Sequence, residues 1–175
     1  MGSIFSRETE GDPDELRLKA RLLKEQAMEY GRESQVAYLR GDKSTAHSLS
    51  VQKKELYKKA NDMNSKAMKK YIETNNQDNS KTVLDLHGLH VHEAIETLEK
   101  RVSKLCSKAK VDDLYLYVIT GKGNNSANGI VKLRPAVLDW AERNNEYIEF
   151  YEVDSRNSGQ IILKLRKRDT FCVIL

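Results

Sequence analysis

Cysteine is scarce in this chain, which holds only Cys106 and Cys172 among its 175 residues. Two thiols cannot supply the disulfide framework that small secreted domains use, so we expect a reducing compartment, the cytoplasm. Long apolar runs are also lacking. No stretch reaches the roughly 20 apolar residues that a membrane-spanning helix needs, and no secretory signal peptide is recognisable. The mean hydropathy of −0.67 is that of a well-solvated protein.

An excess of one charge sign is lacking too. The formal net charge is only +4, and residues 81–165 carry twelve Lys or Arg against twelve Asp or Glu. A broad basic face of the kind that many nucleic-acid-binding proteins use is therefore not expected. Any contact with phosphate would depend on a local patch.

Residues 12–75 have the pattern of two long helices. Asp12 and Pro13 are typical of a helix start, and Ser44 is the expected cap of the second helix. Because the connection near Gly41 is short, the pattern predicts an antiparallel helical hairpin. Lys53 occupies one position of the seam between the helices. The other seam residues recur at heptad spacing: Leu16, Ala20, Leu23, Ala27, Tyr30, Ser34, Ala37, Leu49, Leu56, Ala60, Met63, Ala67 and Tyr71.

The second helix also carries a cluster of lysines. These side chains could follow a phosphate backbone or a ribosomal RNA surface. The interpretation that we favour is a solvated helix face, because acidic residues are interspersed on the first helix. The hairpin holds no catalytic constellation and is expected to act as an arm or recognition module. The cluster consists of Lys53, Lys54, Lys58, Lys59, Lys66, Lys69 and Lys70.

A polar segment, 76–81, is expected to link the hairpin to a second domain at 82–167. There the pattern predicts a small β-α-β-α-β-β sandwich with a four-stranded mixed sheet, hence an α+β or α/β fold class. Cys106 lies beside the apolar stripe of the first helix of this domain and is predicted to be a buried thiol. The predicted elements are strand 82–87, helix 91–109, strand 114–119, glycine loop 120–129, helix 131–144, and strands 147–153 and 160–166.

Two strand exits carry the polar residues from which a site can be built. Asp85 and His87 alternate at the end of the first strand, before Gly88, so both point to one face of the sheet. The second strand ends in the glycine loop that starts at 120–123. If the two strands are neighbours, a carboxylate, an imidazole and a basic glycine loop meet at the edge where open α/β sheets bind ligands.

This set of groups suits cleavage of a phosphodiester bond. An imidazole can take or give a proton near neutral pH, and Asp85 could orient it. The N–H groups of the glycine loop can cradle a phosphate, to which Lys122 adds charge. Arg134 could reach the same phosphate or could be a surface residue. In RNA, His87 would deprotonate the 2′-hydroxyl, a step that needs no metal and no cofactor. Metal-assisted hydrolysis with a divalent ion on Asp85 is the alternative.

A structural zinc site of His87, His90 and His92 is disfavoured, because His87 belongs to the strand exit and no cysteine is nearby.

Two motifs in this order resemble the Smr (small MutS-related) domain. The first is the run 84–89 followed by Glu93 and Ala94, and the second is 120–123 followed by Ser126 and Gly129. The helical region resembles the domain that often precedes Smr in eukaryotic members, through the residues Gly41, Asp42, Leu49, Ser50, Met63, Asn64, Ala67, Asn75 and Asn76.

The resemblance implies endonuclease activity on DNA or RNA, including messages on stalled ribosomes, and in some members RNA binding alone. It assigns cleavage to Asp85 and His87. Thr120 stands where some members carry histidine, and Asn125 stands where many do. These two departures leave substrate contact possible but count against turnover. We expect cleavage of RNA in preference to DNA; the alternative is a non-catalytic RNA-binding or membrane-tethered adaptor. The expected substrate-binding residues are Gly88, Thr120, Gly121, Lys122, Gly123 and Arg134.

The N-terminus, 1–11, is expected to be flexible, and both it and the C-terminal tail, 168–175, carry lipidation patterns. Gly2, with Ser6 after it, fits N-myristoylation, and Cys172 fits C-terminal geranylgeranylation beside a basic run. The alternatives are a chance match at the first end and a hydrophobic C-terminus that folds back on the sheet. Lipidated ends would bring the protein to a membrane surface.

Overall fold

The computed structural model describes residues 11–77, 79–108, 114–122 and 131–166. The chain divides into two compact units, and their boundary falls between Lys70 and Tyr71, inside a helix. No helix in the described ranges is long and apolar enough to cross a membrane. The predicted lipidation positions, Gly2 and Cys172, lie outside the described residues and stay predictions.

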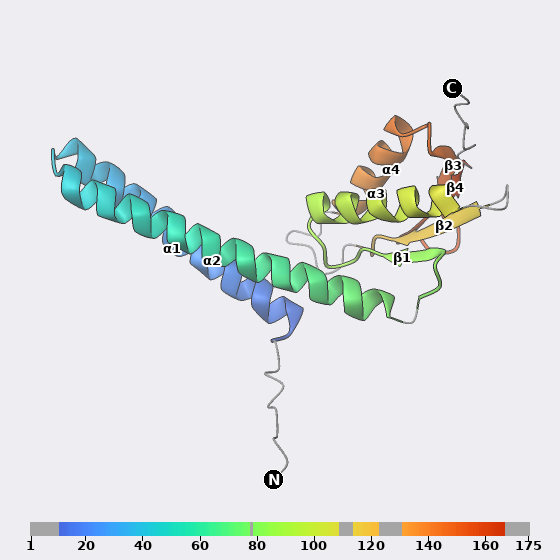
Figure 1. The fold of residues 1–175 in the computed structure, drawn as a ribbon, viewed down its shortest axis with the longest axis horizontal. Coiled ribbons are helices and arrows are strands. Elements are labelled where there is room, and N and C mark those ends of the chain that lie inside the picture. Colours follow the sequence, from blue (N-terminus) through green and yellow to red (C-terminus); the bar gives the residue numbers. More distant parts are fainter. Residues whose placement is uncertain (1–10, 78, 109–113, 123–130, 167–175) are drawn as a thin grey trace, which may run out of the picture. The chain divides into compact units, whose positions relative to one another are not determined.

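Two antiparallel helices, α1 (Pro13–Leu39) and α2 (Lys43–Asn76), form the hairpin that the heptad pattern predicts (Figure 1). The expected cap at Ser44 is wrong. Asp42 precedes α2, and its Oδ1 accepts the backbone N–H of Thr45 at 3.0 Å. Lys43 is already helical, so Ser44 falls in the first turn, where it cannot cap. The helix also continues through Asn76, one residue past the expected end of the hairpin.

Small side chains fill the contact between α1 and α2. Alanines at the seam let the two backbones approach closely, because the distance between packed helices depends on the side chains between them. Lys53, the polar member of the seam, lies across Gly31, where an added Cβ would be 3.1 Å from the lysine Nζ. The glycine therefore makes room for the lysine stem. The buried members are Leu16, Ala20, Ala27, Ala46, Ala60 and Ala67.

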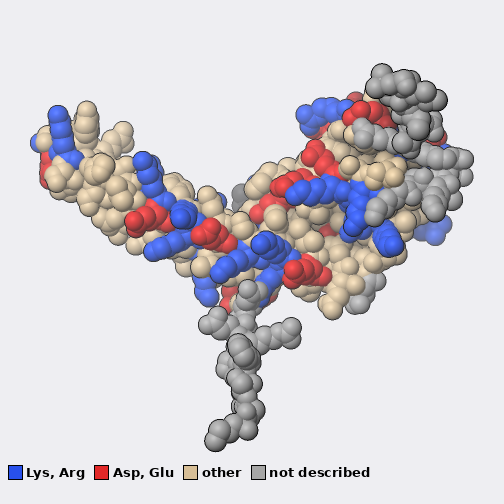
Figure 2. Space-filling model, viewed as in Figure 1, with Lys and Arg blue, Asp and Glu red and all other residues tan. Residues whose placement is uncertain are grey.

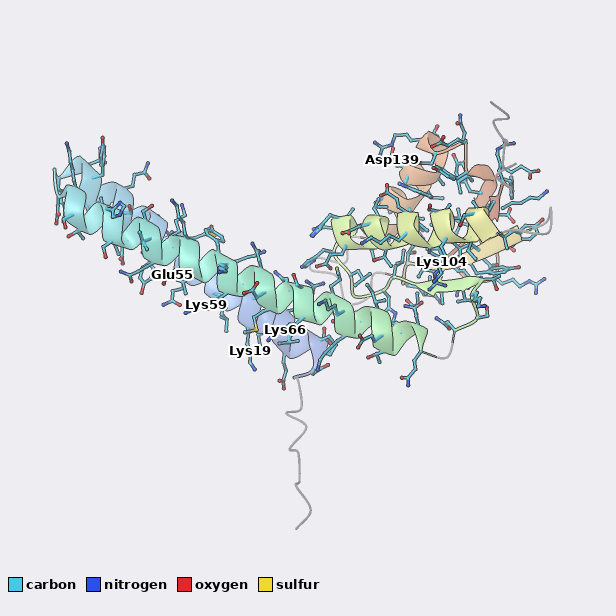
Figure 3. The ribbon with its side chains drawn as sticks, viewed as in Figure 1. Lys19, Glu55, Lys59, Lys66, Lys104 and Asp139 are labelled. Carbon is cyan, nitrogen blue, oxygen red and sulfur yellow. The ribbon has the colours of Figure 1, made fainter. Side chains whose placement is uncertain are left out.

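Acidic and basic side chains alternate along the hairpin, as Figure 2 shows. Lys59 and Lys66 follow Glu55 along α2, and all three side chains are exposed (Figure 3). This mixture agrees with the interpretation of the lysine cluster as a solvated helix face.

The second unit contains a four-stranded mixed sheet with the strand order β1-β2-β4-β3, which confirms the predicted fold class. β1 pairs in parallel with β2, so the two strand exits of the sequence analysis are neighbours. β4 runs antiparallel to both β2 and β3. The strands are β1 (Val83–Asp85), β2 (Leu114–Ile119), β3 (Ile148–Val153) and β4 (Gln160–Leu165).

Helices α3 (Val91–Lys108) and α4 (Leu133–Arg143) lie on the same side of the sheet (Figure 1). The core lies between them and one sheet face, because alternate strand residues are buried there. Cys106 is 1% exposed in this core, which confirms its expected place. The largest fully buried side chains are Leu84, Leu86, Leu98, Val102, Leu116, Val118, Val137, Ile161, Leu163 and Leu165.

Polar contacts fix the helices in this unit. Trp140 of α4 donates its Nε1–H to Glu99 of α3 at 3.0 Å. Arg101 of α3 donates to the carbonyl oxygens of Lys81 at 3.1 Å and Val83 at 3.3 Å, which holds β1 against the helix. Partial burial lowers the pKa of the Arg101 guanidinium.

Candidate active site

A hydrogen-bonded carboxylate and imidazole stand at the end of β1. Oδ1 of Asp85 lies 2.7 Å from Nδ1 of His87, and the same oxygen accepts the backbone N–H of His87 at 2.9 Å. The Asp85 side chain is 14% exposed and the His87 side chain 53% exposed. The carboxylate is thus partly sheltered and holds both the backbone and the ring of a histidine that solvent and a ligand can reach.

A glycine turn carries the chain away from this pair. Gly88 has a φ of +80°, in the left-handed region that glycine adopts at little cost. A Cβ added at Gly88 would lie 2.5 Å from Cε1 of Tyr71, so the tyrosine ring fills the space that a side chain at position 88 would need. Glu93 then accepts the backbone N–H of His90 at 2.9 Å, as the N3 residue of a capping box does, and α3 begins. The turn is therefore held by the Tyr71 ring at Gly88 and by the Glu93 carboxylate at the start of α3.

The glycine loop after β2 lies beside His87. Gly121 has a φ of +73°, and a Cβ added there would lie 3.5 Å from Cβ of His87. Thr120 before it is buried, and its hydroxyl donates to the carbonyl oxygen of Gly159 at 3.2 Å. Thr120 therefore anchors the loop to the turn between β3 and β4. Lys122 follows and is exposed, whereas Gly123 lies outside the described residues.

The turn between β3 and β4 contacts both the glycine loop and Arg134, the last of the residues predicted to bind substrate. A Cβ added at Gly159 would lie 3.2 Å from both the backbone carbon of Gly121 and Cγ of Lys122, so this glycine permits a close approach. Arg134 of α4 donates from Nη1 to the carbonyl oxygen of Ser158 at 3.0 Å. Arg134 thus lies against the turn that supports the loop, with further N–H donors on its guanidinium.

Sequence reasoning missed two side chains that hold this site. Asn76 donates from Nδ2 to the carbonyl oxygen of Asp85 at 2.9 Å and accepts the Asp85 N–H on Oδ1 at 2.8 Å. Asn75 donates from Nδ2 to the carbonyl oxygen of His87 at 3.0 Å. Neither was expected to take part in the site, although both are among the residues that resemble the domain preceding Smr. The adjacent asparagines were a signal of this kind, because amide side chains readily bond to backbone groups.

No three His, Cys, Asp or Glu side chains gather in a way that could hold a metal ion, within the ranges that the structure describes. His90 and His92 stack on one another with ring centroids 6.1 Å apart.

Comparison with known sequences identifies both parts of the chain. Residues 84–166 match the Smr domain, and residues 14–76 match a domain of unknown function, DUF1771. The solution structure of the B3BP Smr domain is 32% identical and covers 59% of this chain and 96% of its own, with a TM-score of 0.45.

Two fungal proteins are similar over much of the chain. Endonuclease NBR9 of Saccharomyces cerevisiae is 39% identical over 136 residues, which are 77% of this chain and 53% of the yeast protein. An Smr domain-containing protein of Schizosaccharomyces pombe is 36% identical over 112 residues, 63% of this chain and 52% of its own. The chain spans about half the length of these curated relatives. With both domain matches in this order, the chain belongs to the Smr-domain family, as a member in which DUF1771 precedes the Smr domain.

Proposed function

We propose that this protein is an endonuclease that cleaves phosphodiester bonds in RNA, with His87 as general base and Asp85 as the residue that orients it. The observation that carries the proposal is the 2.7 Å hydrogen bond between Asp85 and the exposed ring of His87, beside the glycine loop. The similarity to a yeast protein named as an endonuclease supports this reaction class.

The hydrogen bond determines which ring nitrogen can act. An ionised carboxylate only accepts, so Nδ1 of His87 carries the hydrogen and Nε2 carries the lone pair. Nε2 is therefore the atom that takes a proton from substrate. Asp85 also stabilises the imidazolium that results, as the buried carboxylate does in Ser-His-Asp triads.

The proposed step is an attack within the RNA strand. Nε2 of His87 removes the proton of a 2′-hydroxyl, and the 2′-oxygen forms a bond to the adjacent phosphorus while the bond to the 5′-oxygen breaks. The 5′-oxygen leaves with a proton from water, which yields a 2′,3′-cyclic phosphate and a 5′-hydroxyl. The N–H groups near Gly121 and the charge of Lys122 offset the negative charge that develops on the phosphate.

The test uses end-labelled single-stranded RNA, with and without a chelator. Loss of a general base costs about 10²- to 10⁴-fold in rate, so we expect His87→Ala to lower cleavage by that amount. Asp85→Asn should also lower the rate, because an amide can hold the ring in the other tautomer. His92→Ala is the matched control, since His92 is an exposed histidine of the same unit.

Two further results separate the mechanism from metal-assisted hydrolysis. A single 2′-deoxy substitution at the cleaved position should block the reaction, and a chelator should leave it intact. Cleavage that survives His87→Ala, or that continues on the 2′-deoxy substrate, would overturn the proposal.

A further inference from the structure

The sheet of the second unit has a face that α3 and α4 do not cover. On β2, Leu116 and Val118 are buried beneath the helices, whereas Tyr115 is 38% exposed on the opposite face. On β4 the buried residues are Ile161, Leu163 and Leu165, so Ile162 and Lys164 belong to the other face. Soluble proteins seldom leave such apolar and aromatic side chains at the surface in a contiguous patch without a binding role.

Three residues form one row across this open face. Tyr115 of β2 pairs with Lys164 of β4, which pairs on its other side with Phe150 of β3. Phe150 is 49% exposed. Neighbouring strands lie about 4.8 Å apart, so the two aromatic residues stand roughly 10 Å apart with the lysine between them.

The row holds little free charge. Nζ of Lys164 lies 3.0 Å from Oε1 of Glu149, and the Lys164 side chain is only 22% exposed. The ammonium group is thus paired with a neighbouring acid. What the row offers to a ligand is the flat faces and edges of two aromatic rings, which suit stacking better than contact with phosphate.

This face continues to the candidate active site. Asp85 pairs with Ile119, and Val83 pairs with Tyr117, in the register of β1 on β2. Ile119, Tyr117 and Tyr115 alternate with the buried residues of β2 and so share the open face with Asp85. A strand of nucleic acid with one phosphate at His87 can therefore continue along the same face to the aromatic row.

We propose that the open face of the sheet binds unpaired nucleotides of the RNA substrate, with Tyr115 and Phe150 as stacking platforms for bases. This inference rests on the proposed function and adds a substrate class to it, single-stranded RNA. Bases within a duplex stack on each other, so protein rings of this kind reach only bases that are splayed out.

The binding test uses the full-length His87→Ala protein, which should not consume the probe, and a fluorescein-labelled single-stranded RNA in fluorescence anisotropy. Stacking of one base on an aromatic ring is worth about tenfold in affinity. We expect Tyr115→Ala and Phe150→Ala each to weaken binding by that factor. Tyr115→Phe and Phe150→Tyr should bind as the parent does, whereas Phe150→Leu, which keeps apolar area without a ring, should be weak.

Salt dependence gives an independent readout. Lost stacking lowers affinity at every salt concentration without changing the slope of affinity against salt, because no phosphate contact disappears. Tyr38→Ala is the matched control, since Tyr38 is an aromatic residue of α1 that is 64% exposed. Thermal melts of each variant, and ultraviolet crosslinking of the parent to RNA with mapping to β2 or β3, guard against an effect of misfolding.

The outcomes separate this inference from the function on which it rests. Parental affinity in Tyr115→Ala and Phe150→Ala, together with cleavage that still needs His87, would overturn the stacking face and leave the nuclease proposal standing; the face would then be free for a protein partner. Equal binding of duplex and single-stranded RNA would also overturn it. If the parent binds no RNA and the wild-type chain cleaves none, both proposals fail.

Discussion

The side-chain amide of Asn76 pairs with the backbone of Asp85 as a neighbouring β-strand would. Its Nδ2 donates to the Asp85 carbonyl oxygen at 2.9 Å, and its Oδ1 accepts the Asp85 N–H at 2.8 Å. β1 is an edge strand of the sheet that the described residues form, so within that sheet these backbone groups have no partner strand on their outer side. One helical side chain therefore takes the place of a fifth strand at the residue that orients His87.

Replacement of this amide should affect both stability and catalysis. Asn76→Ala removes the two partly buried hydrogen bonds to Asp85, each worth about 1 kcal/mol net, together with its hydrogen bonds to Ile72 and Asn79. From the Asp85 pair alone we expect a loss of about 2 kcal/mol in the free energy of unfolding. We also expect a lower kcat with little change in KM, because the carboxylate that aims His87 loses its support. Urea denaturation and RNA cleavage measure the two effects. Asn61→Ala, an exposed asparagine of α2, is the control and should change neither.

Gly88 should tolerate no side chain, for two separable reasons. Its φ of +80° disfavours other residues, and an added Cβ would lie 2.5 Å from the Tyr71 ring. Gly41 has a φ of +85° with no atom within 4 Å of an added Cβ, so Gly41→Ala should cost only the backbone term, about 1–2 kcal/mol.

We expect Gly88→Ala to cost clearly more than Gly41→Ala in denaturant unfolding. In a Tyr71→Ala background the cost of Gly88→Ala should fall toward that of Gly41→Ala. If Gly88→Ala costs the same free energy of unfolding with and without the Tyr71 ring, the ring is not what excludes a side chain at position 88.

Lys122 should contribute one charge contact with the substrate. We expect Lys122→Ala to raise KM for RNA and to reduce the slope of log affinity against log salt by about one. The reason is that an exposed lysine at the glycine loop would release one counterion on binding phosphate. Lys104→Ala, an exposed lysine of α3 (Figure 3), is the control. A slope that is the same in both variants would argue against a phosphate at Lys122.

Asp42 should make the stability of the hairpin depend on pH. Its hydrogen bond with Thr45 lowers the pKa of the Asp42 carboxyl below its usual value. A pKa that is lower in the folded state means that the ionised group stabilises the fold above the unfolded-state pKa, and that this contribution is lost as pH falls through the folded-state pKa. The advantage of the wild type over Asp42→Ala should therefore be full at pH 7 and shrink in acid.

The matched variant is Asp42→Asn, because asparagine also caps helices but does not titrate. Thermal unfolding at neutral and acidic pH measures the comparison. The loss of stability in acid that we expect of the wild type should be smaller in Asp42→Asn. An equal loss in both proteins would show that it does not come from the Asp42 carboxyl.

Much of the fold was predictable because its signals are local. β2 was expected at 114–119 and lies there, since a nearly continuous apolar run marks a central strand. The cap at Asp42 was missed in favour of Ser44, because both residue types cap helices and only the backbone decides between them.

The support of the site was not predictable by the same means. Tyr71 fits the heptad seam, yet its ring lies against Gly88. Asn76 belongs to the helix, yet its amide bonds to Asp85. Both are contacts between segments that are adjacent in space only after folding, and hydrophobic periodicity carries no information about them.

The boundary between the two compact units, between Lys70 and Tyr71, determines where a fragment that contains the Smr domain should begin. The DUF1771 match ends at residue 76 and the Smr match begins at residue 84, so the segment between them looks like a natural place to cut the chain. A polypeptide that starts at residue 84 would lack Tyr71, whose ring lies against Gly88, and both asparagines that bond to the backbone of Asp85 and His87. A fragment meant for crystallography or NMR should therefore begin upstream of Tyr71 and retain the last turns of α2.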